Sequence, residues 1–239
     1  MVIFLAGASG AVGRRLVPLL LNTGHVVTGT TRSPTTAEAL RQSGVNPVVL
    51  DIFDAAAVTA AMRAARPEIV IDQLTDFPKD FNAAAMQASF PRNVRLYREG
   101  TRNLIEGARA AGAQRLIAQS YAFAYSPGGE PHLEEDALNL ADPIRGPVIA
   151  GVAEMERLLL AATDIGALIL RYGLLYGSGT WSDTAPDKPA LHIDAAAHAA
   201  LLATECGAPG IYNIADDDGA VSIAKARREL GFDPAFRLG

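Results

Sequence analysis

Three glycines near the start of the chain, Gly7, Gly10 and Gly13, are spaced so that they can bind a pyrophosphate. They follow the apolar run 2–6 and lead into residues 12–21, whose apolar positions recur at helical spacing. In a strand–turn–helix of this kind, backbone N–H groups at the helix N-terminus bind phosphate oxygens. The sequence therefore predicts a dinucleotide site, the alternative being an ordinary tight turn. The residues predicted to line it are Gly7, Ser9, Gly10, Ala11, Val12 and Gly13.

Composition narrows the classes of partner and site. The chain has 239 residues, a net charge of −5 and acidic and basic residues interspersed, whereas a nucleic-acid surface usually carries a basic stripe. No apolar run approaches the length of a membrane span. The single cysteine, Cys206, excludes an intramolecular disulfide and offers no metal cluster. We expect a cytoplasmic protein that has no metal and binds neither nucleic acid nor membrane.

Strand-like and helix-like segments alternate along the chain. This alternation predicts an α/β protein of the Rossmann type, a doubly wound parallel sheet with right-handed crossovers. Strands are expected at residues 2–6, 26–31, 47–50, 69–74, 115–120, 167–171 and 210–214. Helices are expected at residues 12–21, 36–42, 55–64, 81–111, 148–162, 195–204 and 223–230. Within the long fourth helical segment, Pro91 should interrupt or kink the helix.

Two regions follow from this arrangement. Residues 1–172 are predicted to form the dinucleotide-binding Rossmann domain, and residues 173–239 a reduced substrate-binding lobe that packs with it as one compact unit. The segments 126–131 and 177–189, rich in proline, glycine and aspartate, are predicted to be loops facing the site. The shape of the pocket depends on the loops at 126–142 and 178–191, which no motif constrains, so the sequence leaves the substrate open.

In addition to the glycines, ordered motifs run through most of the chain: residues 49–52, 69–75, 100–104 and 171–177. With them the chain resembles the extended short-chain dehydrogenase/reductase superfamily, in its NAD(P)-dependent epimerase/dehydratase group. The resemblance implies cofactor contacts from Asp51, at the adenine amine, and from the adjacent Ile52. It also implies that Leu74 and Thr75 lie beside the cofactor ribose.

The second strand of this fold ends near the adenosine ribose, and its last residues select the cofactor. Residues 27–33 carry no acid there, whereas Arg32 offers a guanidinium that can bind a 2′-phosphate. Thr31 and Ser33 add hydroxyl donors. We predict NADP(H) in preference to NAD(H), which remains possible; the alternative for Arg32 is a solvated loop cation.

The proton-transfer pair of the redox members of this superfamily is missing. Those members carry Tyr-x-x-x-Lys, in which the lysine cation lowers the pKa of the phenol from its reference value of about 10. Here Val148 and Val152 align with the two positions, and no Tyr-x-x-x-Lys occurs anywhere in the chain. Any chemistry that needs a proton must therefore use a substitute.

The end of the fifth strand offers candidates for that substitute. Ser120 keeps a hydroxyl there, and Tyr121 aligns with the serine or threonine that the family uses. Tyr121 and Tyr125 are each able to present a phenol to the site, so Ser120, Tyr121 and Tyr125 are our candidate catalytic residues. The alternative for the phenols is a structural role in the wall of the site. Asp72 and Asp76 are alternative bases.

Three functions remain open. The first is an NADP(H)-dependent oxidoreductase or epimerase-like enzyme that acts on a small carbonyl or hydroxyl substrate with a substitute acid. The second is a non-redox catalyst on the same scaffold, an isomerase, cyclase or dehydratase. The third is an inactive nucleotide sensor or partner-binding protein. The segment 178–191 is short for a substrate lid, and its Trp181 can cover either a ligand or the core.

The resemblance also implies a homodimer, formed through the fourth and fifth helices packed as a four-helix bundle. Small and apolar side chains suit such a contact. They are Ala83, Ala84, Ala85, Met155, Leu158 and Leu159.

Overall fold

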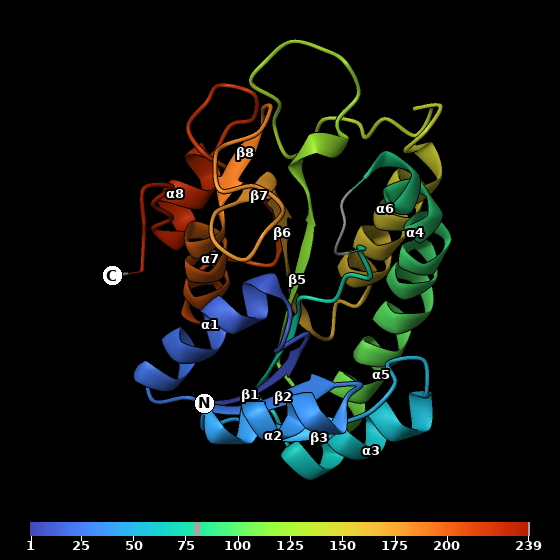
Figure 1. The fold of residues 1–239 in the computed structure, drawn as a ribbon, viewed down its shortest axis with the longest axis vertical. Coiled ribbons are helices and arrows are strands. Elements are labelled where there is room, and N and C mark those ends of the chain that lie inside the picture. Colours follow the sequence, from blue (N-terminus) through green and yellow to red (C-terminus); the bar gives the residue numbers. More distant parts are fainter. Residues whose placement is uncertain (79–81, 239) are drawn as a thin grey trace.

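Seven parallel strands form the central sheet in the computed structural model, which describes residues 1–78 and 82–238 (Figure 1). The strands lie in the order β3-β2-β1-β4-β5-β6-β9. Their bounds are Val2–Ala6 (β1), Val26–Thr31 (β2), Asn46–Val49 (β3), Ile69–Asp72 (β4), Arg115–Tyr121 (β5), Gly166–Tyr172 (β6) and Gly210–Ile214 (β9). The chain order reverses at β1, between β2 and β4, as in a doubly wound sheet. The predicted fold class is thereby confirmed.

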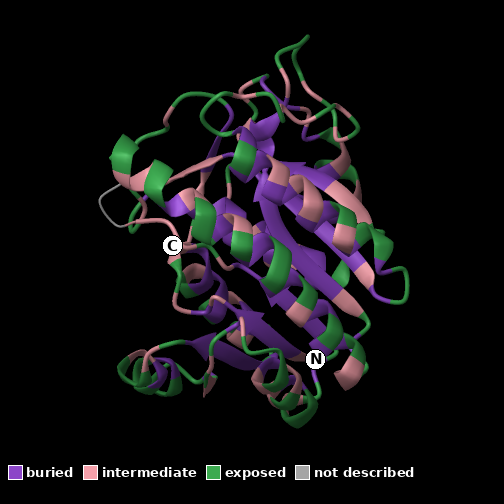
Figure 2. Cartoon of the chain, turned by 90° about the vertical axis from the view of Figure 1, so that its right-hand side faces the viewer, coloured by how far each residue is buried: buried purple, intermediate pink, exposed green. Residues whose placement is uncertain are grey.

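Helices cover both faces of the sheet, because most strands are apolar on both sides (Figures 1 and 2). One face packs against helices α1 (Ala11–Asn22), α2 (Pro34–Gln42), α7 (Ile193–Glu205) and α8 (Ala224–Leu230). The other face packs against α3 (Ala55–Ala65), α4 (Ala83–Arg95), α5 (Thr101–Ala111) and α6 (Gly146–Ala161). Two apolar clusters, one on each face, make up the core of the described residues.

The long fourth helical segment is divided differently from the prediction. Its predicted first residue, 81, lies outside the described residues. Pro91 stands inside α4 and does not interrupt it. The irregular turn comes later, at Leu96–Gly100, where the helix adopts π-helical hydrogen bonding before α5 begins. Such turns are frequent at functional sites, and this one carries Tyr97, which reaches the cavity wall described below.

The C-terminal segment joins the main sheet. Strand β9 pairs with β6, and α7 packs against α1, so the division predicted at residue 172 runs through a sheet that both parts share. A second, two-stranded sheet that the sequence did not indicate pairs β7 (Leu174–Tyr176) with β8 (Ala190–His192). Among the described residues, no helix is both long enough and apolar enough to cross a lipid bilayer.

Candidate functional site

A cavity of about 1710 Å³ opens at the carboxyl ends of the parallel strands. This is where ligands bind in open α/β sheets, at the point where the strand order reverses. Most of the predicted site residues line it: Gly7, Ser9, Gly10, Ala11, Val12, Thr31, Arg32, Asp51, Ile52, Leu74, Thr75, Ser120 and Tyr121. Three do not, namely Gly13, Ser33 and Tyr125.

The glycine loop leaves no room for side chains. A Cβ on Gly7 would lie 2.7 Å from the carbonyl oxygen of Gln73, and Gly7 adopts a φ of +89°. A Cβ on Gly13 would lie 2.2 Å from the carbonyl oxygen of Gly7. Gly13 therefore acts from behind the cavity, by letting α1 pack closely on the loop. These contacts show that the spacing serves a tight cradle, and such a cradle fits a dinucleotide pyrophosphate.

The N-terminus of α1 supplies the charge for that cradle. Gly10 caps the helix without a side-chain hydrogen bond, and the first turn contains no acidic residue. The helix dipole and the first-turn N–H groups therefore face the cavity without an acidic side chain from the first turn, which favours a bound phosphate. Arg14, also in the lining, adds a cation next to the loop.

The end of β2 presents Arg32 to the same cavity. Its side chain is 74% exposed and lies 3.5 Å from Asp76, which also accepts a hydrogen bond of 2.8 Å from Arg92. Two guanidinium groups thus share one carboxylate near the predicted ribose. Ser33 has a different role, because its hydroxyl accepts the N–H of Thr36 and caps α2.

Tyr121 lines the cavity with its hydroxyl already engaged. That hydroxyl forms a hydrogen bond with the hydroxyl of Tyr97, from the π-helical turn, and the two rings meet edge to face. Tyr97 also donates to Asn93 Oδ1 at 3.4 Å. Burial raises the pKa of both phenols, and the contact with Tyr121 adds to the rise at Tyr97. The phenols therefore hold their protons tightly at neutral pH.

Asp72 ends β4 beside this pair and is 8% exposed. Burial raises the pKa of its carboxyl to about 7, against a hydrogen bond of 3.0 Å from the N–H of Leu74 that favours the charged form. Asp72 is not part of the cavity lining, whereas its neighbours Gln73 and Leu74 are. The carboxyl is therefore a buried titratable group behind the site.

Ser120 and Tyr125 belong to a buried polar network. The hydroxyl of Ser120 donates to Glu156 at 2.6 Å, and Glu156 accepts two hydrogen bonds from Arg171, at 2.9 and 2.7 Å. Tyr125 receives a hydrogen bond of 2.8 Å from Arg171 and donates to Asn213 at 2.7 Å. The network ties α6 to β5, β6 and β9. It engages both hydroxyls within the protein, and Tyr125 stands outside the cavity wall.

The two positions that align with the missing Tyr-x-x-x-Lys pair carry apolar side chains, and their surroundings in the structure are apolar too. Val148 lines the cavity from the first turns of α6, and Val152 is fully buried beneath it. No described group of histidine, cysteine, aspartate and glutamate side chains is arranged to hold a metal ion. This end of the cavity therefore places an apolar surface where the redox members have a proton donor.

Several lining residues were not found from the sequence. Aromatic rings from Phe77, Phe90 and Phe123 join Tyr121 in the wall, and Arg145 lines it just before α6. The sequence position of Arg145 could have indicated its place in the lining, because it lies directly before a predicted helix and three residues before Val148, which aligns with the family's tyrosine. The rings come from loops or from the helix after β4. In these segments no periodicity in the sequence indicates which side chains point into the cavity.

Comparison with known proteins agrees with this geometry. A family described as NAD(P)H-binding matches residues 7–188. A 3-diazoavenalumate denitrifying reductase from a Streptomyces species is 41% identical, over all of this chain and 84% of that protein.

Solved structures show the same fold. UDP-glucose 4-epimerase from Thermotoga maritima has a TM-score of 0.82 at 18% identity, covering 99% of this chain and 94% of that one. UDP-glucose 4-epimerase from Thermus thermophilus, in complex with NAD, has a TM-score of 0.78 at 20% identity, covering 100% and 95%. The chain therefore belongs to the NAD(P)H-binding family of the extended short-chain dehydrogenase/reductase superfamily and is an oxidoreductase-like enzyme.

Proposed function

We propose that this enzyme is an NADP(H)-dependent reductase that replaces an aromatic diazonium group of its substrate by hydrogen and releases dinitrogen. The observation that carries the proposal is the apolar Val148 at the cavity end where the family places its proton donor, together with an intact glycine cradle. A reaction that needs hydride but no proton fits a site of this composition.

The proton balance separates the candidate reactions. Reduction of a carbonyl forms a C–H bond and leaves an alkoxide, which needs a proton from the protein. In an arenediazonium ion, a hydride forms the new C–H bond while the C–N bond breaks, and its electron pair leaves with N₂. The diazonium cation and the hydride together give two neutral products, the arene and N₂, so the reaction requires no proton transfer. NADPH, when bound, supplies that hydride.

A named relative supports this choice. The Streptomyces reductase is named for a diazo compound and for the removal of nitrogen, and its identity of 41% extends over the whole chain. The epimerases of known structure are 18–20% identical and support the fold alone. Epimerisation of a sugar alcohol would also require proton transfer at the position that Val148 occupies.

The chain's own residues have distinct roles in this proposal. The first turn of α1 and Arg14 hold the pyrophosphate, and Arg32 holds the 2′-phosphate in place of Asp76. Val148 and the aromatic wall exclude water from the reacting carbon, which protects an electrophile from hydrolysis.

Deuterium transfer tests the reaction. We expect the protein, with 4-deuterated NADPH and a ¹⁵N-labelled 4-carboxybenzenediazonium salt, to release one ¹⁵N₂ per NADPH oxidised and to place deuterium on the arene carbon. The rate without protein is subtracted. Substrate turnover without NADPH oxidation would overturn the proposal and favour non-redox catalysis.

A second candidate is carbonyl reduction with Tyr121 as substitute acid, because its ring lines the cavity. The Tyr121→Phe variant separates the two reactions. Diazo reduction should keep its rate within about twofold, whereas a reaction that takes its proton from the phenol should lose about 10²–10⁴-fold.

The cofactor preference has its own test. We expect Arg32→Asp to weaken NADPH binding by about tenfold or more and to leave NADH binding unchanged, because the new carboxylate repels a 2′-phosphate. Titration calorimetry with both nucleotides measures this. Unchanged affinities for both would contradict the NADP(H) assignment.

A further inference from the structure

Aromatic rings gather at the end of β5, where the cavity meets α6. Phe77 and Tyr121 lie with ring centroids 6.2 Å apart, and Tyr121 stacks on Phe123 at 4.8 Å with an interplanar angle of 20°. All three line the cavity. Stacked rings of this kind make an apolar aromatic wall, and an aromatic ring is a ligand that packs well against such a wall.

The hydroxyls at this wall are already engaged. Ser120 donates to Glu156, and the hydroxyl of Tyr121 is paired with that of Tyr97. A sugar would bring several hydroxyls that each require a partner once buried, since an unpaired buried polar group is costly. The wall therefore fits an aromatic ring better than a carbohydrate.

Arg145 is a cation beside this apolar wall. It lines the cavity one turn before Val148, and Asp142 binds its Nε and Nη2 atoms at 3.2 and 3.1 Å. Asp142 also accepts the N–H groups of Ile144 and Arg145, at 2.9 and 2.6 Å, which fixes the turn. Within the described residues Nη1 has no protein acceptor, so the oriented guanidinium keeps donors for an anion.

The other arginines of the lining have places elsewhere. Arg14 stands beside the glycine loop, and Arg32 and Arg92 share Asp76. Arg95 pairs with Glu99 and lies over the ring of Phe53. Among the described lining residues, Arg145 is the one cation on the α6 side, next to the aligned catalytic positions.

The geometry points to an aromatic carboxylate as the substrate class, with its ring on the wall of Phe77, Tyr121 and Phe123 and its carboxylate on Arg145. Arg145 is thereby assigned as the residue that selects the acid. This assignment rests on the proposed function for the location of the reacting group. The binding it describes needs no diazo group, so it is tested separately.

Binding of a non-reactive acid and its amide is the test. Cinnamate and cinnamamide have the same ring and nearly the same shape but differ in charge. We expect the protein, saturated with NADP⁺, to bind cinnamate about ten- to a hundredfold more tightly than cinnamamide, as for a charge-assisted Arg–carboxylate contact. Arg145→Met should remove that difference, while Arg145→Lys should keep part of it.

Arg157 is the matched control. It lies on the outer side of the same helix and is held through Nε and Nη2 by Glu154, three residues before it, as Asp142 holds Arg145. Arg157→Met should bind both probes like the wild type. An unchanged NADP⁺ affinity in every variant shows that the fold and the cofactor site are intact.

Three results would overturn the assignment. They are equal affinities for the acid and the amide in the wild-type protein, an equal loss in the Arg157→Met variant, and binding of UDP-glucose without binding of cinnamate. Failure of the deuterium experiment with retained acid selectivity would refute the diazo reaction and leave the substrate class standing.

Discussion

At Gly13, the absence of a side chain lets helix α1 pack closely on the glycine loop. A Cβ there would meet two carbonyl oxygens, those of Gly7 at 2.2 Å and Ala8 at 2.7 Å, and backbone atoms do not yield as a flexible side chain does. We expect Gly13→Ala to lower the free energy of unfolding by about 1–3 kcal/mol, as for overpacking. NADPH affinity should fall as α1 moves, which calorimetry measures.

The control for this variant is Gly129→Ala. A Cβ at Gly129 has no heavy atom within 4 Å, and the residue does not adopt a positive φ. Its unfolding and NADPH binding should match the wild type. Equal behaviour of the two variants would mean that the cradle is not tight at Gly13.

Asp72 makes stability depend on pH in a defined direction. Its pKa rises from 3.8 to about 7 on folding, so the folded chain takes up a proton between these values. Folding stability therefore falls as the pH rises through this window, and the penalty is complete above pH 7. At about 1.4 kcal/mol per unit, it amounts to roughly 4 kcal/mol at most.

The Asp72→Asn variant should remove this penalty while its amide oxygen still accepts the N–H of Leu74. We expect the variant to gain about 2–4 kcal/mol over wild type at pH 8, and less than about 1 kcal/mol at pH 4.5. Urea unfolding at the two pH values measures the difference. An equal gain at both would show that Asp72 does not titrate in this range.

Residue types predicted the cofactor half of the cavity better than the substrate half. The glycines act through backbone shape, so their spacing alone indicates the cradle. Whether Tyr121 or Tyr125 faces the cavity depends on how β5 ends, and both stand in the same short apolar run. Arg145 was missed because a turn brings it next to Asp142 and exposes it to the cavity. Such a turn leaves no periodic pattern in the sequence.

At the scale of elements, the strands were predictable because a strand that is buried on both faces of the sheet has a run of consecutive apolar residues. Three strands, Val2–Ala6, Val26–Thr31 and Gly210–Ile214, have the predicted bounds. The β7–β8 pair was missed because each strand has three residues and pairs within a loop region. An interruption or kink was expected at Pro91 from the propensity of proline, whereas α4 continues through Pro91 and the π-helical turn lies at Leu96–Gly100.

Helix α6 is fixed to the sheet by charge as well as by apolar contact. Glu156 and Arg171 are 5% and 3% exposed and pair at 2.7 Å. Glu156→Gln leaves the guanidinium buried without its counter-charge, so we expect a loss of about 3–5 kcal/mol in the free energy of unfolding. Chemical unfolding measures this. A double Glu156→Met, Arg171→Met variant should recover much of it, since two apolar residues leave no unpaired charge.

Glu154→Gln on the outer side of α6 is the comparison. Glu154 pairs with Arg157 and Arg102 at the surface, where ion pairs contribute about 0–1 kcal/mol. A loss in this variant as large as that in Glu156→Gln would contradict the view that burial makes the inner pair important.

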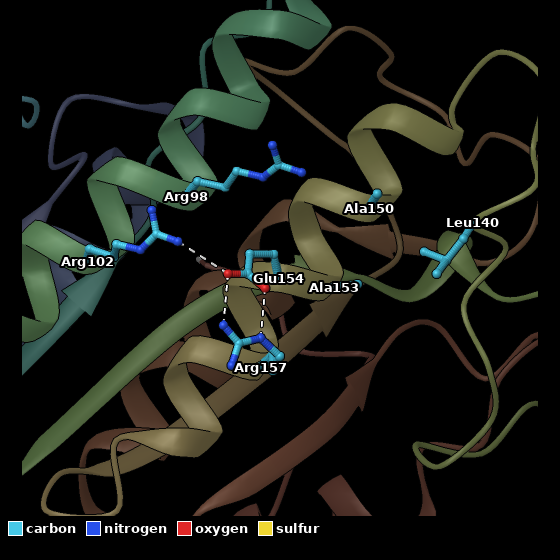
Figure 3. A pocket seen from close by; sticks show the side chains of 7 residues that line it. All are labelled: Arg98, Arg102, Leu140, Ala150, Ala153, Glu154 and Arg157. Atoms are coloured by element: carbon cyan, nitrogen blue, oxygen red, sulfur yellow. Dashed lines mark hydrogen bonds and ion pairs between the residues drawn. The ribbon is translucent and has the colours of Figure 1, made fainter.

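At the scale of the whole molecule, the surface between the π-helical turn, α5 and α6 bears on the predicted homodimer. Figure 3 shows a hollow there, in which Arg102 and Arg157 both bind Glu154 and Arg98 stands beside them. Its seven lining residues include three arginines and one glutamate, a formal charge of +2. Of the apolar residues named for the dimer contact, Met155 and Leu159 are buried in the protein's own core.

A symmetric dimer through α4, α5 and α6 would bring this arginine-rich hollow close to its copy, because a two-fold axis pairs the same surface with itself. The repulsion between two such surfaces is screened by salt, with a Debye length that shortens from about 30 Å at 0.01 M to about 10 Å at 0.1 M. We therefore expect dimerisation to strengthen as salt is added across this range, measured by sedimentation equilibrium.

An Arg98→Gln, Arg102→Gln variant should dimerise more tightly at low salt and respond less to the addition of salt. Dimerisation that weakens with salt would place the contact on oppositely charged surfaces instead, and a monomer at micromolar concentration throughout would show that the dimer prediction is wrong.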